Sequence, residues 1–370
     1  MKPLEGLKVV ELARILAGPW IGQALADLGA EVIKVESPQG DDTRRWGPPF
    51  IERDGDRTAA YFYAANRGKT SVVADFRTEE GQQIVRRLLR DADIVIENFK
   101  VGGLAKYGLD YDSLRADHPR LIYCSITGFG QDGPYANRAG YDFLIQGMSG
   151  LMSITGEPEG QPQKVGVAVT DIVTGLYGTI GVMAAVEQRH RTGRGQQVDM
   201  SLLDCATALL ANQAMNYLAT GDSPARRGND HPNIAPYQVL PTADGHIILA
   251  VGNDGQFQRL CGVLQRGDLG SDARFASNHE RVAHREALTR ALTESLAIWG
   301  SAALLSALEA ATVPAGPINS VAAAFADPQI VARGMVVTPE GVPGVRGPWK
   351  FSDAELALEK SAPVLPEQGC

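Results

Sequence analysis

Short apolar strands alternate with amphipathic helices from residue 7 to residue 127, and this alternation constrains the fold more than any other feature. Residues 7–12 and 31–36 are predicted strands, with a predicted helix over residues 19–28 between them. Two strands joined through a helix pair in parallel, with a right-handed crossover. The pattern continues with strands over 71–75, 94–97 and 121–127 and helices over 79–90 and 111–116. The sequence therefore predicts an α/β protein with an open, doubly wound parallel sheet.

Ligands of such sheets bind beyond the carboxyl ends of the strands. One of these ends leads into residues 37–69, which are rich in Asp, Arg, Gly and Pro. We expect this segment to be a long loop that serves a site, because structureless loops of this length are otherwise uncommon. The cations in or beside the loops at this edge are Arg44, Arg45, Arg67, Lys69, Arg77 and Lys106. Solvated surface charge would explain them, but a nucleotide with several phosphates would also require cations here.

The apolar stretch that follows Asp171 predicts a long helix, which is expected to end near Gly193 and Gly195. Asp171 stands at the expected start, where its carboxylate would cap the helix and stabilise it by roughly 1 kcal/mol. The free N–H groups there would also keep its pKa near or below the ordinary value of about 3.9. An ionised carboxylate beside a glycine-rich stretch of backbone could equally act as a covalent nucleophile. Spacing alone does not choose between helix cap and nucleophile.

Beyond this helix the sequence predicts a second, smaller domain. Residues 202–218 have a helical pattern, and residues 221–238 have the turn-residue density of a linker. After the linker, strands over 239–240 and 246–251 flank an Asp-Gly turn and predict a hairpin. The other predicted elements are helices over 256–264, 285–299 and 302–311, followed by short strands and loops.

Composition narrows the class of partner. The chain has 370 residues and a net charge of -8, which argues against nucleic acid and anionic membranes as main partners. No stretch approaches the roughly 20 apolar residues of a membrane span, and the first residues lack a signal-peptide pattern. The four cysteines form no CxxC pair, so neither a disulfide framework nor a zinc site is expected. We therefore expect a reduced, cytoplasmic protein with no bound metal.

Several common catalytic motifs are absent from the sequence. Residues 128–133, GFGQDG, fit the dinucleotide pattern GxGxxG, but the apolar helix that this pattern requires does not follow. A glycine-rich loop is the better interpretation. The chain also lacks HExxH, GxSxG and the P-loop pattern, which argues against the chemistries that these motifs carry. A carboxylate remains the best candidate for covalent chemistry.

Eight stretches, spread in order from residue 3 to residue 257, match one known family. They are PLEGLKVVELARILAGP (3–19), DLGAEVIKVE (27–36), ENF (97–99), TGFGQDGP (127–134), AGYD (139–142), VAVTDIVTGLYG (167–178), RTGRGQQVDMSL (191–202) and GNDGQF (252–257). Together they resemble the class III CoA-transferases, which include formyl-CoA transferase, the carnitine CoA-transferase and α-methylacyl-CoA racemase. Within that family, GDDTRRWGPPF (40–50) and VPAGPIN (313–319) are most similar to the succinyl-CoA:glutarate CoA-transferases.

The resemblance implies that Asp171 is a nucleophile. In the family's mechanism this carboxylate attacks the donor acyl-CoA, forms a mixed anhydride and releases the CoA thiolate. The thiolate then attacks the enzyme's carbonyl, which leaves an aspartyl-CoA thioester and the donor acid, and an acceptor carboxylate reverses these steps. Because one thioester replaces another, the resemblance implies no tightly bound cofactor, and coenzyme A and acyl-CoA act as substrates.

The resemblance also assigns binding residues. Gly252 and Gly255 match a glycine loop that serves the oxyanions and covers intermediates, although GNDG here replaces the four glycines of some relatives. The residues that match CoA-contacting segments are Leu16, Ala17, Arg77, Asn98, Phe99, Lys106 and Tyr107. Ser37 stands where some relatives carry a cation, so one phosphate contact is expected to be missing or replaced.

The predicted activity is transfer of CoA from a donor such as succinyl-CoA to a small carboxylic acid, with a dicarboxylate expected. A racemase on the same fold would use a histidine in AGHD, but this chain has Tyr141 there. A phenol with a pKa of about 10 is a poor partner for α-proton exchange. A non-catalytic CoA-binding protein, the other alternative, would need Asp171 to be only a helix cap.

A dicarboxylate acceptor has a distal carboxylate that needs a cationic partner. We assign Arg45 or Arg67 to this role as a hypothesis, because both lie in the 37–69 segment. The family further implies a Rossmann-like large domain formed by both chain ends, a smaller α+β domain, and an interlocked homodimer. The expected ranges are 1–200 with 328–370 for the large domain, 238–312 for the small domain, and 201–237 and 313–327 for the linkers.

Overall fold

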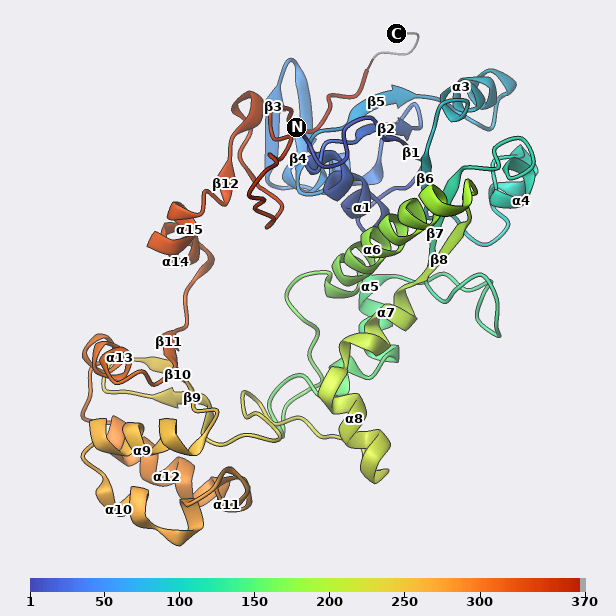
Figure 1. Cartoon of the computed structure of the whole chain (residues 1–370). Coiled ribbons are helices and arrows are strands. Elements are labelled where there is room, and N and C mark those ends of the chain that lie inside the picture. Colours follow the sequence, from blue (N-terminus) through green and yellow to red (C-terminus); the bar gives the residue numbers. More distant parts are fainter. Residues whose placement is uncertain (367–370) are drawn as a thin grey trace. The chain divides into compact units, whose positions relative to one another are not determined.

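The computed structural model describes residues 1–366, which fold into two compact units (Figure 1). Of the described residues, the larger unit comprises 1–152, 164–222 and 329–366, and the smaller unit comprises 153–163 and 223–328.

Two segments fall on the other side of the expected boundaries. Residues 201–222 were expected in a linker but belong to the larger unit, where Leu202 packs in the core. Residues 153–163 belong to the smaller unit. The Arg226 guanidinium explains this grouping, because it donates hydrogen bonds to the carbonyl groups of Glu157 and other residues of that segment.

A six-stranded sheet forms the centre of the larger unit (Figure 1). Its order is β5-β2-β1-β6-β7-β8, and every neighbouring pair is parallel. The strands are β1 (Lys8–Glu11), β2 (Glu31–Glu36), β5 (Thr70–Val73), β6 (Ile94–Glu97), β7 (Ile122–Thr127) and β8 (Gln197–Ser201). The predicted doubly wound α/β fold is thereby confirmed. The unpredicted β8 is an edge strand in which polar residues alternate with Val198 and Met200.

Side chains of the strands alternate between two faces, and helices cover both. Val9 and Ile94 pack on the face of α1 and α6, whereas their neighbours Val10 and Val95 pack on the face of α3 and α4. The covering helices are α1 (Ala17–Asp27), α6 (Val169–Thr192), α3 (Glu79–Leu89) and α4 (Tyr111–Leu114). Burial on both faces is typical of parallel sheets and explains the nearly continuous apolar runs in the sequence.

Helix α6 packs close to α1 because its glycines leave room for large side chains. A Cβ on Gly175 would lie 2.8 Å from Trp20, and one on Gly178 would lie 2.5 Å from Ile21. By length and composition α6 could cross a membrane, contrary to the expectation that no stretch qualifies. The bent pair α12 (Arg285–Leu296) and α13 (Ser301–Ala310) also passes when it is taken as one span. In this fold α6 is a core helix of the larger unit.

The 37–69 segment is ordered, which corrects the expectation of a long loop. It contains η1 (Asp42–Arg45), the hairpin of β3 (Phe50–Arg53) and β4 (Asp56–Ala59), and the single-turn helix α2 (Ala60–Tyr63).

A buried charge cluster (Glu11, Lys34, Asp41 and Lys69) ties this segment to the sheet. Lys34 Nζ lies 3.0 Å from Glu11 Oε1 and 2.9 Å from Asp41 Oδ2, and Lys69 Nζ lies 2.8 Å from Glu11 Oε2. Burial favours the neutral form of Asp41, but the Lys34 charge and hydrogen bonds outweigh it and lower the pKa of Asp41 to about 2. Lys34 also donates to the carbonyl of Ala13 at 2.9 Å, so the cluster holds the chain that leaves β1.

The smaller unit is an α+β unit. Its antiparallel sheet, in the order β11-β10-β9, contains β9 (Tyr237–Pro241), β10 (His246–Ala250) and β11 (Ala315–Pro317), and the predicted hairpin is β9 with β10. Its core is formed with α9 (Asp254–Val263), α10 (Gly267–Ser271), α11 (Asn278–Ala283), α12 and α13. Helices α9, α12 and α13 correspond to the three predicted helices.

Other helices and strands of the larger unit are α5 (Asp142–Met148), α7 (Leu202–Leu209), α8 (Ala211–Thr220), β12 (Val336–Val337) and β13 (Gly344–Val345). Helix α14 (Val321–Ala326) belongs to the smaller unit, and α15 (Pro328–Ala332) begins at the last residue of that unit. The single helix predicted over 202–218 is in fact two helices, because Ala211 has a φ of 44° and interrupts it.

Replacing Lys34 with Met tests the role of the buried charge cluster. The change leaves Glu11 and Asp41 with less compensation in a water-free site, so we expect a loss of roughly 3–5 kcal/mol in the free energy of unfolding. Urea unfolding followed by circular dichroism measures it. Lys8→Met, on the exposed first residue of β1, is the control and should change stability by less than about 0.5 kcal/mol. Equal stability of both variants would contradict a stabilising role for the cluster.

Candidate active site

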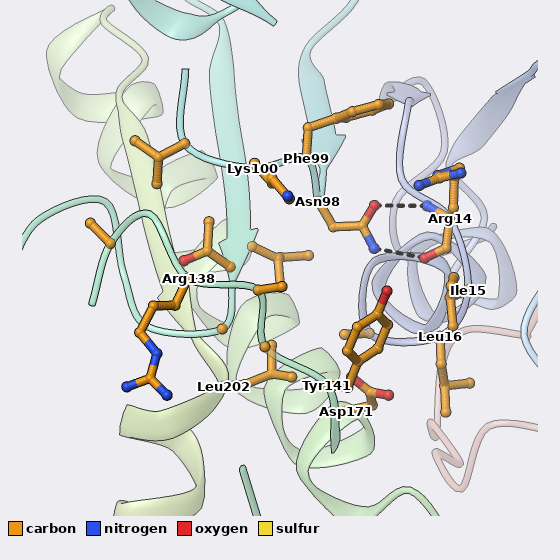
Figure 2. Close-up of a pocket in the computed structure, with 18 residues that line it drawn as sticks. Arg14, Ile15, Leu16, Asn98, Phe99, Lys100, Arg138, Tyr141, Asp171 and Leu202 are labelled. Atoms are coloured by element: carbon orange, nitrogen blue, oxygen red, sulfur yellow. Dashed lines mark hydrogen bonds between the residues drawn. The ribbon is translucent and has the colours of Figure 1, made fainter. Parts of the chain in front are cut away.

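The strand order reverses between β1 and β6, and a cavity lies beside the carboxyl ends of these two strands. Ligands of doubly wound sheets bind at such a reversal, because the loops that follow the two strands diverge there. The cavity has a volume of about 240 Å³. Its walls are Arg14–Ala17 after β1, Asn98–Val101 after β6, Ile126–Gly128 at the end of β7, and Ala136, Arg138–Tyr141, Asp171 and Leu202 (Figure 2). The cavity thus brings together six of the predicted site residues: Leu16, Ala17, Asn98, Phe99, Tyr141 and Asp171.

The wall after β1 is held by Asn98. The Asn98 side chain accepts a hydrogen bond from the Arg14 backbone N–H at 2.9 Å and donates one to the Arg14 carbonyl at 2.7 Å (Figure 2). The next residue, Ile15, has a φ of 72°, a conformation that costs energy for a β-branched residue. Its N–H donates to Asp41 of the buried charge cluster at 3.2 Å. Asn98 therefore shapes the cavity through the backbone of Arg14, and Leu16 and Ala17 follow at the start of α1.

Asp171 is not the cap of α6, which corrects one of the two sequence interpretations. The helix begins at Val169, so Asp171 lies inside its first turn. The free N–H of Thr170 is bound instead by the carboxylate of Asp142, at 2.8 Å. None of the described residues donates a hydrogen bond to the half-buried carboxylate of Asp171.

The pKa of Asp171 is correspondingly the opposite of the expected one. Burial, and next the negative charge of Asp142, raise the pKa of Asp171 to about 7. A lowered pKa would require N–H groups of the helix to donate hydrogen bonds to the Asp171 carboxylate. In the structure the Thr170 N–H donates to Asp142 instead. Asp171 is consequently more basic than an ordinary aspartate and titrates near neutral pH.

Two tyrosines lie near the carboxylate. Tyr141 lines the cavity beside it and is 67% exposed (Figure 2). Tyr61, in α2, was missed by sequence reasoning. Burial, and then the charges of Asp171, Asp142 and Asp41, raise the pKa of Tyr61, so Tyr61 lies within electrostatic reach of these carboxylates. The sequence around Tyr61 carries no motif that would single it out.

A second cavity of about 570 Å³ adjoins the first and shares Arg14, Phe99 and Lys100 with it. It contains four residues predicted to bind CoA: Arg77, Phe99, Lys106 and Tyr107. Phe76 joins the rings of Phe99 and Tyr107 by edge-to-face contacts, with ring centroids 5.6 and 5.5 Å apart. Cations and aromatic faces on one wall suit a phosphorylated nucleotide.

Three of the six cations expected at the loop edge are buried in ion pairs. Arg67 donates two hydrogen bonds to Asp27, at 3.0 and 2.6 Å, and a third to the carbonyl of Val345. The assignment of Arg67 to a substrate carboxylate is therefore wrong, because its guanidinium is buried and already paired. Arg44 pairs in the same way with Glu36, and Lys69 belongs to the buried charge cluster.

Arg45 also differs from its predicted place. It is exposed, pairs with Asp42 and lines the second cavity rather than the cavity of Asp171. The cations that do line the Asp171 cavity are Arg14, Lys100 and Arg138. Arg138 stacks over the ring of Tyr135, 4.5 Å from its centroid. Sequence reasoning passed over these three, although Arg14 lies within a motif that it used and Lys100 and Arg138 each lie next to one.

Gly252 and Gly255 belong to the smaller unit, where their motif is the start of a helix. Gly252 donates its N–H to Gln256 Oε1 at 2.7 Å, and Asn253 caps α9. The fully buried Arg281 binds Asp254 at 2.7 Å. The GNDG segment is thus a capped helical turn, anchored from within its own unit.

The comparison with known families bears directly on this site. Residues 4–368 match the family described as CoA-transferase family III. The chain belongs to this family. As a member it is a class III CoA-transferase, which uses CoA thioesters as substrates, and the family predicted from the motifs is confirmed.

Individual relatives match over nearly the full chain. The succinate–glutarate CoA-transferase of Agrobacterium fabrum is 58% identical over 99% of this chain and 93% of its own. The succinyl-CoA:glutarate CoA-transferase of Homo sapiens is 40% identical over 99% of this chain and 84% of its own. A crystal structure of a CAIB/BAIF family protein from Brucella suis is 64% identical, has a TM-score of 0.90, and covers 100% of this chain and 97% of that chain. This solved structure also confirms the fold class.

Proposed function

We propose that this CoA-transferase moves CoA from succinyl-CoA to a small dicarboxylic acid, with Asp171 as its covalent nucleophile. One observation carries the proposal: a half-buried carboxylate that accepts no hydrogen bond from the described residues lies in the cavity where the strand order reverses. A carboxylate freed from helix capping keeps its lone pairs available for attack. Its pKa of about 7 makes it a stronger nucleophile than an ordinary aspartate, and a large fraction is still ionised at neutral pH.

The chemistry then follows from this one side chain. A carboxylate oxygen of Asp171 attacks the thioester carbonyl, the C–S bond breaks, and the CoA thiolate leaves behind a mixed anhydride. The thiolate next attacks the Asp171 carbonyl and expels the donor carboxylate, which gives an aspartyl-CoA thioester. An acceptor carboxylate attacks that thioester, and the same two steps in reverse regenerate Asp171. Every thioester broken is replaced by another, so positioning is the main demand on the protein.

The two adjoining cavities supply places for the two ends of the CoA thioester. In this proposal the thioester lies in the Asp171 cavity, and the phosphates lie in the second cavity with Arg77 and Lys106. Arg14 and Lys100 line both cavities, so they stand where the connecting part of the coenzyme would pass. Fixed cations favour an anionic ligand that crosses this surface.

A dicarboxylate as the acceptor has two supports. The Agrobacterium fabrum and human relatives are named for succinate or succinyl-CoA and for glutarate. The Asp171 cavity also has three cations in its walls, Arg14, Lys100 and Arg138, which suit an acid with a second carboxylate.

Product analysis tests the function. The protein is incubated with succinyl-CoA and glutarate, and glutaryl-CoA is expected; hydroxylamine added during turnover should then modify Asp171, as found by peptide mass spectrometry. Asp171→Ala should lower the rate by more than about a thousandfold, because the covalent route is lost. Glu187→Gln, a charge change at the exposed end of the same helix, is the control and should retain the parental rate. Transfer by Asp171→Ala at the parental rate would refute the proposal.

We also propose that the chain works as a homodimer. Large apolar side chains are exposed on three elements of the larger unit: Phe143 of α5 is 60% exposed, Ile180 of α6 is 64% exposed and Leu218 of α8 is 71% exposed. No residue of α8 is buried. Apolar surface of this kind is typical of an interface.

Light scattering after size-exclusion chromatography tests the homodimer. A dimer is expected for the parent, and Ile180→Asp should weaken it by placing a charge on the apolar surface. A parent that is monomeric at micromolar concentration would contradict the proposal.

A further inference from the structure

We propose that Asp142 is a positioning residue for the nucleophile: it fixes the first turn of α6 and keeps a second negative charge beside Asp171. The inference rests on the proposed function, since it concerns the nucleophile of that reaction. Asp142 does not line the Asp171 cavity, and no sequence motif assigned it a role.

The geometry is a closed set of hydrogen bonds between α5 and α6. Oδ1 of Asp142 accepts from the Thr170 N–H at 2.8 Å and from the Thr170 hydroxyl at 2.7 Å. Its other oxygen, Oδ2, accepts from Gln146 Nε2 at 2.8 Å. Thr170 and Gln146 are fully buried. Water cannot replace these bonds, so the chain immediately before Asp171 is held by Asp142.

Gln146 also forms a hydrogen bond with the segment that leads into α6. Its Oε1 accepts a hydrogen bond from the N–H of Val165 at 2.9 Å. One short helix, α5, therefore binds the chain at Val165 and again at Thr170, on both sides of the turn into α6. The position of the Asp171 carboxylate depends on that turn.

A close backbone contact fixes Asp142 in turn. A Cβ on Gly128, at the end of β7, would lie 2.5 Å from the Cα of Gly140. This contact holds the residues just before α5 against the carboxyl edge of the sheet. The sheet, Gly140, Asp142 and the first turn of α6 thus form one continuous support.

The charge of Asp142 acts together with this support. The carboxylate of Asp142 accepts three hydrogen bonds, whereas that of Asp171 accepts none from the described residues. The repulsion between the two neighbouring negative charges therefore favours the protonated form of Asp171. Burial, and then Asp142, raise the pKa of Asp171. The other titratable or charged groups near Asp171 are Tyr61 on α2, which feels its charge, and Tyr141, Arg14, Lys100 and Arg138, which line the same cavity.

The consequence is a nucleophile that is strong but sensitive to acid. A raised pKa increases the basicity of the attacking oxygen, and it also leaves a smaller ionised fraction as the pH falls. If Asp142 sets this balance, removing its charge should improve ionisation at low pH and weaken the attack at high pH.

Asp142→Asn tests the charge. The rate of formation of the aspartyl-CoA thioester from succinyl-CoA is measured in a single turnover between about pH 5 and pH 9, and the thioester is trapped with hydroxylamine. The acid limb of the profile should move down by roughly one pH unit, because a like charge beside Asp171 is gone. The rate at high pH should fall about tenfold or more.

Thr170→Val tests the hydrogen bond between Thr170 and Asp142 separately from the charge. It removes the hydroxyl that binds Asp142 and keeps the charge, so the rate should fall about tenfold while the acid limb stays in place. Glu187→Gln, which removes a carboxylate elsewhere on α6, should change neither. Should Asp142→Asn fail to fold, Asp142→Ser carries the same prediction, because its hydroxyl can still accept from Thr170.

An acid limb that coincides in Asp142→Asn and the parent would overturn the role of the charge. A parental rate in Thr170→Val would overturn the role of the hydrogen bond between Thr170 and Asp142 in positioning Asp171. Absence of any trapped thioester in the parent would instead refute the proposed function, so the two failures are distinguishable.

Discussion

The hydrogen bonds that Asp142 makes to Thr170 are the constraint on which the rest of the site depends. The start of an α-helix needs acceptors for its free N–H groups, and here a neighbouring helix supplies one. Asp171, one residue further along, is thereby left half-buried and without a donor among the described residues. A carboxylate in that situation becomes basic and reactive, and the same arrangement explains both its raised pKa and its suitability as a nucleophile.

The sheet topology decides where this carboxylate meets its substrate. Reversal of the strand order between β1 and β6 opens a cavity at their carboxyl ends, and α6 begins beside it. Residues outside the cavity fix parts of its walls by hydrogen bonds. Asn98 fixes the backbone of Arg14, and the buried charge cluster fixes Ala13 and Ile15 through Lys34 and Asp41. Buried charges that do not line the cavity therefore support the same geometry as the residues that do.

The sequence predicted much of this and missed what depends on distant partners. Local patterns were sufficient for five of the six strands of the parallel sheet and for the long helix after Asp171, since periodicity is a local property. They missed the edge strand β8 and the hairpin of β3 and β4. They could not show that Asp142 caps that helix, because the capping side chain comes from a different element. Nor could they show that Arg67 forms an ion pair with Asp27, because the sequence pattern of a loop is the same whether its cation is free or paired. The motifs identified Asp171, but only the fold explains its chemistry.

A direct titration of Asp171 tests whether burial and the neighbouring Asp142 keep its carboxylate basic. The protein is labelled with ¹³C at the aspartate carboxyl carbons, and spectra of the parent and of Asp171→Asn are compared as the pH is varied. We expect a resonance that titrates near pH 7 in the parent and is missing in Asp171→Asn. A resonance assigned to Asp171 that titrates below about pH 5, as an ordinary aspartate does, would contradict this expectation.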